Sequence, residues 1–226
     1  MPQKSASAKK LGNTRVTGKE QYYTPAELAD SLLKEVIQFV PDISKRTILE
    51  PAGGTGSFIN AARKAGAKKF LSFDIEPKHE SVTLANFLDA DISATDAVTI
   101  SNPPFGRNNS LSIPFFNKAA DHSEYICFIV PRSWRKWSVI NRLDQRFHLV
   151  ADHDIRIDYE NDLGQKLSER NNLATCFQIW QRKPQLRPKY SVADQGLIEK
   201  TTPAKADVAL TIFGFGCGKL LTDFER

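Results

Sequence analysis

The chain has 226 residues, enough for one sizeable α/β domain with an appendage and too few for two large domains. Its 41% hydrophobic and 25% charged residues exclude a fibrous or wholly disordered protein. The formal net charge of +5 indicates a weak preference for polyanionic partners.

Most of the net positive charge lies in residues 1–20, where five basic side chains precede the first acid, Glu20. Such a segment is typical of a flexible basic arm, which either stays solvated or contacts nucleic acid electrostatically. The basic residues are Lys4, Lys9, Lys10, Arg15 and Lys19.

The sequence gives little support for a metal site, a disulfide framework or a membrane span. Three scattered cysteines, Cys127, Cys176 and Cys217, form neither a disulfide framework nor a zinc spacing, so we expect a reducing, cytoplasmic environment. The four histidines show no H-x-x-x-H spacing, and we expect no metal. No apolar run approaches the ~18 residues of a membrane span, and the polar N-terminus lacks the apolar core of a signal peptide.

The first predicted helix follows Thr24-Pro25, because leucines and Val36 recur there at helical spacing until Pro41 ends the pattern. Residues 47–50 are typical of a short buried strand that runs directly into a glycine-rich turn. A helix over 57–64 and a strand over 69–73 are expected next.

Downstream, the predicted strands and helices continue to alternate, which indicates an α/β fold with a mainly parallel sheet covered by helices on both faces. Ligands of such sheets bind at the carboxyl ends of the strands. Residues 184–226 are expected to be a C-terminal extension, with a linker or exposed loop at its start and a hairpin over 206–220. The further strands are expected over 82–88, 97–101, 125–130, 149–157 and 174–181, and the helices over 112–121 and 133–146.

The glycine-rich turn joins Glu50-Pro51 to Gly53, Gly54 and Gly56. It lacks the Lys-Ser/Thr ending of a phosphate loop and does not match G-x-G-x-x-G, which argues against ATP and NAD. A carboxylate at its mouth repels a pyrophosphate but attracts a ligand with an ammonium and a sulfonium, such as S-adenosylmethionine. Asp74, rather than Glu76, is then expected to accept hydrogen bonds from ribose hydroxyls. The alternative is a structural turn with two solvated acids.

A second motif, Asn102-Pro103-Pro104-Phe105, ends the strand predicted over 97–101. Two prolines hold the backbone extended without N–H groups, so carbonyl oxygens are free to face a ligand. The Asn102 amide oxygen accepts a hydrogen bond, and Phe105 supplies a flat face. Together they suit a planar group that carries an NH₂.

These motifs resemble those of the class I S-adenosylmethionine-dependent amino-methyltransferases that carry a [DNS]-P-P-[FYW] signature. The segment 21–25, Gln-Tyr-Tyr-Thr-Pro, is similar to the family's N-terminal motif, 50–58 to its cofactor loop and 86–88 to its adenine-contacting segment. The order of the motifs is similar to that of the gamma-type adenine-N6 DNA methyltransferases.

The resemblance implies a Rossmann-like fold with a mostly parallel seven-stranded sheet over residues 21–183, and S-adenosyl-L-methionine as cofactor. The implied reaction is methyl transfer to the exocyclic N6 amine of adenine in nucleic acid, with DNA slightly favoured over RNA. Asn102, Pro103, Pro104 and Phe105 are implied as catalytic residues. The implied cofactor-binding residues are Tyr22, Tyr23, Thr24, Glu50, Pro51, Gly53, Gly54, Gly56, Phe58, Asp74, Ile75, Asn86 and Phe87.

The sequence departs from the family in two respects. Asn86 stands where the family usually has Asp, and Asp89 and Asp91 are rival positions. DNA-modifying members usually append a long target-recognition domain, whereas only the extension 184–226 follows here. A partner subunit would then supply target recognition.

A basic and aromatic stretch follows the strand predicted over 125–130. Cations beside aromatic rings suit single-stranded or distorted nucleic acid. The alternative is an amphipathic helix whose tryptophans are core and whose charges are solvated. The predicted substrate contacts are Arg107, Arg132, Trp134, Arg135 and Lys136.

Two other functions remain open at the level of the sequence. Asn-Pro-Pro-aromatic motifs also serve the methylation of glutamine in proteins, because that amide is another planar NH₂ group, so a protein glutamine N5-methyltransferase is the enzymatic alternative. A catalytically silent methyltransferase-fold partner that binds nucleic acid is the non-enzymatic one. The intact Glu50 and Asn102 motifs argue against the silent partner.

Overall fold

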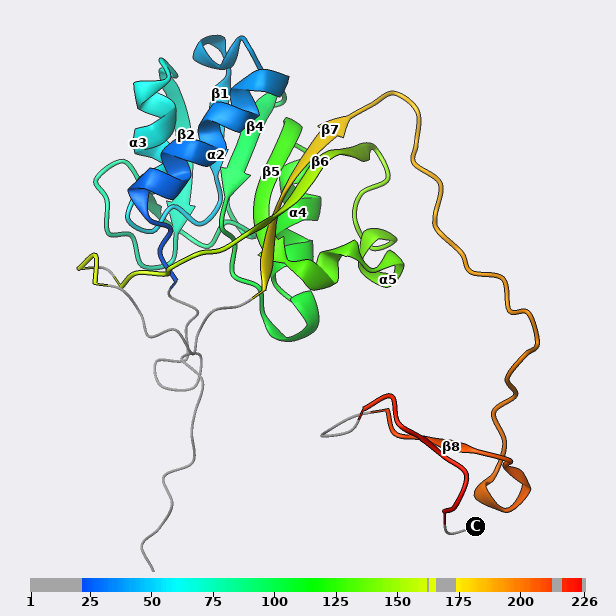
Figure 1. Ribbon diagram of the computed structural model, residues 1–226. Coiled ribbons are helices and arrows are strands. Elements are labelled where there is room, and N and C mark those ends of the chain that lie inside the picture. The colour runs from blue at the N-terminus through cyan, green and yellow to red at the C-terminus, as the bar shows by residue number, and fades with distance from the viewer. Residues whose placement is uncertain (1–21, 162, 166–173, 213–216, 225–226) are drawn as a thin grey trace, which may run out of the picture. The chain divides into compact units, whose positions relative to one another are not determined.

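The computed structural model describes residues 22–161, 163–165, 174–212 and 217–224, and the chain divides into two compact units (Figure 1). The first unit ends at Tyr190, seven residues beyond the boundary expected at 183, and the second begins at Ser191. The basic arm expected over 1–20 lies outside the described residues, as does Gln21.

A seven-stranded sheet in the order β3-β2-β1-β4-β5-β7-β6 forms the centre of the first unit. All its strand pairs are parallel except those of β7, which runs antiparallel to both β5 and β6. This arrangement confirms the expected α/β class and the mostly parallel sheet. The strands are β1 (Thr47–Glu50), β2 (Lys69–Asp74), β3 (Thr83–Leu84), β4 (Ala97–Ser101), β5 (Ser123–Pro131), β6 (Phe147–Ile155) and β7 (Thr175–Arg182).

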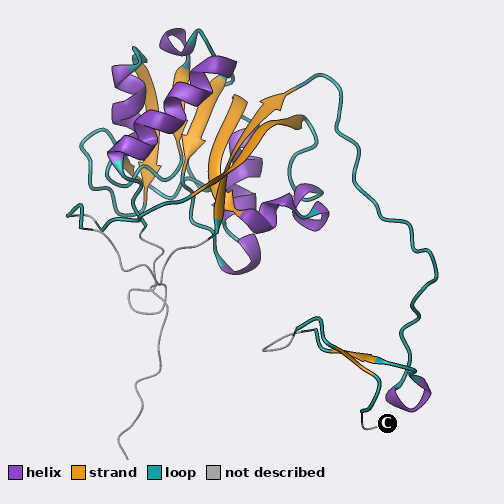
Figure 2. Cartoon of the chain, viewed as in Figure 1, coloured by secondary structure: helices purple, strands orange, loops and turns teal. Residues whose placement is uncertain are grey.

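Helices cover both faces of the sheet (Figure 2). Successive strand side chains point to opposite faces, so Ile48 packs in the cluster beneath α2 (Ala26–Phe39) and α3 (Ser57–Lys64). Its neighbour Leu49 packs in the other cluster, with α4 (Ser112–Ala120). Among the residues of this unit that the structure describes, the last α-helix is the short α5 (Trp137–Ile140), and 3₁₀ turns occur at η1 (Ile43–Lys45), η2 (Arg107–Asn109) and η3 (Arg132–Arg135).

Two predicted elements are shorter than expected. The strand predicted over 82–88 is only β3, because Asn86 turns the chain: its Oδ1 accepts from Leu88 N at 3.2 Å, and its carbonyl oxygen accepts from Asp89 N at 3.0 Å. The helix predicted over 133–146 is replaced by η3 and α5. Asp144 Oδ1 accepts from Arg146 N at 2.8 Å, a turn that leads directly into β6.

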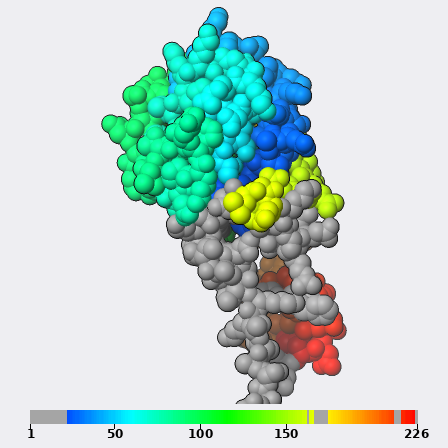
Figure 3. Space-filling view, turned by 90° about the vertical axis from the view of Figure 1, so that its left-hand side faces the viewer, coloured from blue at the N-terminus to red at the C-terminus, as the bar shows by residue number. Residues whose placement is uncertain are grey.

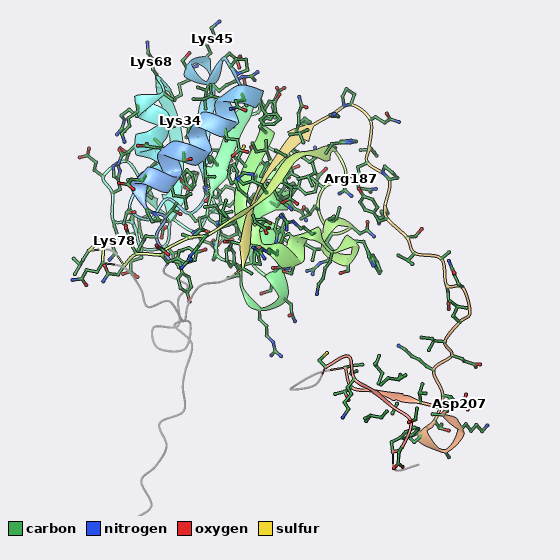
Figure 4. All side chains as sticks on the ribbon, viewed as in Figure 1. Lys34, Lys45, Lys68, Lys78, Arg187 and Asp207 are labelled. Atoms are coloured by element: carbon green, nitrogen blue, oxygen red, sulfur yellow. The ribbon has the colours of Figure 1, made fainter. Side chains whose placement is uncertain are left out.

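The segment after β7 agrees with the linker or exposed loop predicted from residue 184, because every residue from 184 to 190 except Arg187 is exposed. Arg187, labelled in Figure 4, is only 5% exposed and donates to the carbonyl oxygens of Ile140, Leu143 and Phe147. These bonds attach the segment to the turn between α5 and β6. The chain therefore leaves the first unit at Tyr190.

The second unit contains the 3₁₀ turn η5 (Pro203–Lys205) and a small antiparallel hairpin of β8 (Ala209–Leu210) and β9 (Leu220–Leu221), which confirms the hairpin expected over 206–220. Within the described part of the chain, no helix is long and apolar enough to cross a membrane. No group of three histidine, cysteine or acidic side chains suits a metal ion there.

Candidate active site

A cavity of about 570 Å³ opens where β1, β2 and β4 end. Parallel strands bring their carboxyl ends to one edge of a sheet, so segments far apart in the sequence meet there. Most of the predicted site residues line this cavity: Tyr22, Tyr23, Pro51, Gly54, Asp74, Ile75, Asn86, Phe87, Asn102, Pro103, Pro104, Phe105 and Arg107.

A smaller adjoining cavity of about 30 Å³ is lined by four more of the predicted site residues: Thr24, Glu50, Gly53 and Phe58. Asn102, Tyr22 and Tyr23 line both cavities, so the two are parts of one site. Gly56 lines neither of them. It has φ +76° at the start of α3, where a Cβ would collide with the ring of His79 at 2.5 Å.

The turn after β1 requires glycine for steric reasons. Gly54 has φ +45°, and a Cβ there would meet the Tyr23 ring at 2.8 Å; a Cβ on Gly53 would collide with Ser72 Oγ. Gly54 N donates to Asp74 Oδ2 and Glu76 N to Asp74 Oδ1, both at 2.8 Å. The backbone thus fixes the Asp74 carboxylate at the cavity wall, whereas Glu76 pairs with Lys78 at 3.0 Å.

Glu50 ends β1 almost completely shielded from water. Its side chain is 2% exposed, and Oε2 has no hydrogen-bond partner among the described residues. Burial raises the pKa of Glu50 well above its usual range, and the nearby negative charge of Asp74 adds to this. A buried carboxyl group without a cation is the chemical environment that an ammonium group of a ligand would satisfy.

The Asn102 amide is held by the first described residues of the chain. Its Nδ2 donates to Tyr22 O and to Thr24 Oγ1, both at 3.3 Å. These bonds tie the amide nitrogen to the N-terminal segment and do not use Oδ1, the acceptor atom of the amide. The following Phe105 is nearly buried, and its carbonyl oxygen accepts from Leu111 N at 3.3 Å.

Sequence reasoning missed Tyr159, which also lines the large cavity. Because β6 and β5 are both antiparallel to β7, β6 ends at the same edge as the cavity. The loop after it, yellow-green in Figure 3, lies beside the blue start of the described chain. Tyr23 N donates to Glu160 O at 3.2 Å, and the ring centroids of Tyr159 and Tyr22 are 5.1 Å apart. An aromatic residue after a predicted strand was the only signal available, and the direction of that strand was unknown.

The structure also corrects the role expected for Trp134. This side chain is 0% exposed, and its indole N–H donates to Ser112 Oγ at 3.2 Å, so it belongs to the core and cannot reach a substrate. Arg132 and Arg135 are ion-paired with Asp154 and Asp152. Lys136 is exposed and does not line the cavity.

Comparisons with known proteins define the fold. No family model matches the chain, and no curated protein matches it. Among solved structures, a candidate RNA methyltransferase from Pyrococcus horikoshii is 21% identical with a TM-score of 0.57 over 72% of this chain and 88% of that one. A candidate class I S-adenosylmethionine-dependent methyltransferase from Listeria monocytogenes is 16% identical (TM-score 0.51; 74% and 63% covered). The modification subunit of a candidate type I restriction enzyme from Vibrio vulnificus is 14% identical (TM-score 0.53; 75% and 46% covered).

The chain therefore has the Rossmann-like fold of the class I methyltransferases.

Proposed function

We propose that this protein is an S-adenosylmethionine-dependent methyltransferase that acts on the exocyclic N6 amine of adenine in nucleic acid, with DNA slightly favoured over RNA. The observation that carries the proposal is the oriented Asn102 amide, which shares one cavity with Asp74 and the glycine-rich turn. The names of two structural neighbours, a candidate RNA methyltransferase and a modification subunit, support a nucleic-acid acceptor.

The residues of the site fit S-adenosylmethionine. Glu50 offers a buried carboxylate to its ammonium, and Asp74 offers a carboxylate to its ribose hydroxyls. Phe87 and Ile75 line the cavity beyond Asp74 and would pack against its adenine. When bound, this cofactor supplies an electrophilic methyl group.

The chain's own residues would act by positioning the acceptor amine. The lone pair of an adenine amine is delocalised into the ring, which makes the amine a poor nucleophile. Asn102 Oδ1 and the Pro103 carbonyl oxygen would accept hydrogen bonds from the two N–H groups of this amine and favour its pyramidal, nucleophilic form. Phe105 would stack on a base that is unpaired or flipped out of a helix. Arg107, at the rim of the cavity, would contact a phosphate.

The test is transfer of a labelled methyl group from S-adenosylmethionine to unmethylated DNA, RNA and protein pools. We expect label in nucleic acid as N6-methyladenine. Asn102→Ala should abolish transfer and leave cofactor affinity nearly unchanged, because Asn102 contacts the acceptor. Asp74→Ala should weaken cofactor binding first, by about tenfold or more for a lost charge-assisted hydrogen bond.

Other outcomes would redirect the assignment. Label found only in protein, at glutamine, would replace nucleic acid with a protein acceptor. An absence of cofactor binding by the pure chain would support a catalytically silent fold. Cofactor binding without transfer would indicate that a partner subunit recognises the target.

A further inference from the structure

The segment 132–137 lies next to the candidate active site, although none of its residues lines the cavity. It follows β5, so it begins at the sheet edge where the cavity opens. Asn109 Nδ2 donates to Ser133 Oγ at 3.2 Å and thereby joins the segment to η2, the turn that begins with Arg107 at the cavity rim. Asn109 and its neighbour Asn108 have φ values of 62° and 55°, a backbone conformation in which asparagine is several-fold enriched.

The segment is anchored on two sides. Trp134 inserts into the core, where its ring meets the Phe116 ring edge-on with centroids 5.7 Å apart. Arg135 pairs with Asp152 and with Asp154 on β6, both at 2.7 Å. The backbone of such an anchored segment loses little conformational entropy when a partner binds.

Trp137 is the tryptophan that this segment presents to solvent. Its side chain is 52% exposed, whereas Trp134 and Trp180 are buried. Lys136 precedes it, exposed and without an ion-pair partner among the described residues. The acids nearby, Asp152 and Asp154, are already neutralised by Arg132 and Arg135.

We propose that Trp137 and Lys136 form a second contact site for the acceptor, on which an unpaired nucleotide near the target base stacks. The proposal rests on the nucleic-acid acceptor proposed above and extends it to a site outside the cavity. The indole offers a stacking face, and the Lys136 ammonium offers a partner for the adjoining phosphate. Bases within a duplex already stack on one another, so this surface fits a single strand or a locally opened one.

The experiment titrates the full chain, without cofactor, into a short fluorescent oligonucleotide, either single-stranded or paired as the matching duplex. Trp137→Ala should weaken single-strand binding about tenfold, the loss expected for one base–aromatic stack. Lys136→Met should reduce the slope of log affinity against log salt by about one, because one phosphate contact is lost. Leu149→Ala, an exposed apolar side chain near the amino end of β6, is the matched control and should change neither value.

Three results would overturn the proposal: native single-strand affinity in Trp137→Ala, equal loss of duplex binding in that variant, or self-association of the native chain that Trp137→Ala abolishes. The last would assign the surface to a second copy. Cofactor titrations run in parallel separate the two proposals. Trp137-dependent strand binding by a chain that binds no S-adenosylmethionine would support the contact site and reject the reaction, and the converse pattern would do the opposite.

Discussion

Glu50 carries a carboxyl group that is shielded from water at the end of β1, and no described residue donates a hydrogen bond to its Oε2. The folded chain holds a proton on this group more tightly than the unfolded chain does, because burial raises its pKa. The resulting stabilisation is complete below the pKa of the unfolded chain. It is lost as the pH rises toward the raised pKa of the folded state.

This linkage predicts how cofactor affinity depends on pH. An ammonium group binds the Glu50 carboxylate, so affinity for S-adenosylmethionine should increase as the pH rises from mildly acidic to neutral, up to about tenfold per pH unit below the raised pKa. Calorimetric titration across that range measures the slope. Glu50→Gln, which cannot ionise, should bind more weakly and show a flat profile. An equal slope in Glu50→Gln would assign the titration to another group.

At the scale of elements, α4 supports the wall of the cavity that faces the cofactor's expected adenine. Lys118 on α4 donates from Nζ to Leu88 O at 2.8 Å and to Ala90 O at 2.6 Å, and it lies 5.7 Å from the Phe87 ring centroid. Phe87 and Leu88 line the cavity. Lys118 is therefore a positioning residue for this wall, outside the reacting groups.

Lys118→Met keeps the aliphatic stem and removes both donated bonds, so the dissociation constant for S-adenosylmethionine should rise about tenfold. The rate of transfer at saturating cofactor should stay unchanged, because Asn102 and Phe105 are not disturbed. Lys118→Arg should restore part of the affinity. Lys64→Met, which removes only the surface ion pair with Asp30, is the control. A fall in the saturated rate with native affinity would contradict the assignment.

The sequence predicts those parts of the site whose chemistry is local. Glu50, Asp74 and Asn102 each end a short apolar strand, and parallel strands bring such ends together, so their meeting at one cavity follows from the pattern. Trp134 and Trp137 show the limit of this reasoning. The two tryptophans are three residues apart, and both have basic neighbours in the sequence. Only packing against Phe116 decides which of them is buried. The position of Tyr159 at the cavity depends on the direction of β6, which no local sequence pattern encodes.

At the scale of the whole molecule, the boundary between the two units follows from hydrogen bonds rather than from composition. Residues 184–190 contain two prolines and look like a linker, yet their backbone is bonded to the first unit: Arg187 N donates to Gln145 O and Tyr190 N to Asn141 Oδ1, both at 2.8 Å. Beyond Ser191, Leu197 and Ile198 are highly exposed. A protease cleaves a chain segment only after that segment has unfolded locally and broken its contacts with the rest of the protein.

Limited digestion of the full chain with a broad-specificity protease should therefore cut after Tyr190 and spare the bonds between 184 and 190. Mass spectrometry identifies the fragments. The trimmed first unit should keep its melting temperature and its affinity for S-adenosylmethionine, because the cavity residues all precede the cut. Early cleavage beside Leu186 would show that the Arg187 bonds do not hold in solution. Loss of cofactor affinity in a trimmed unit with its native melting temperature would instead assign the second unit a part in the site.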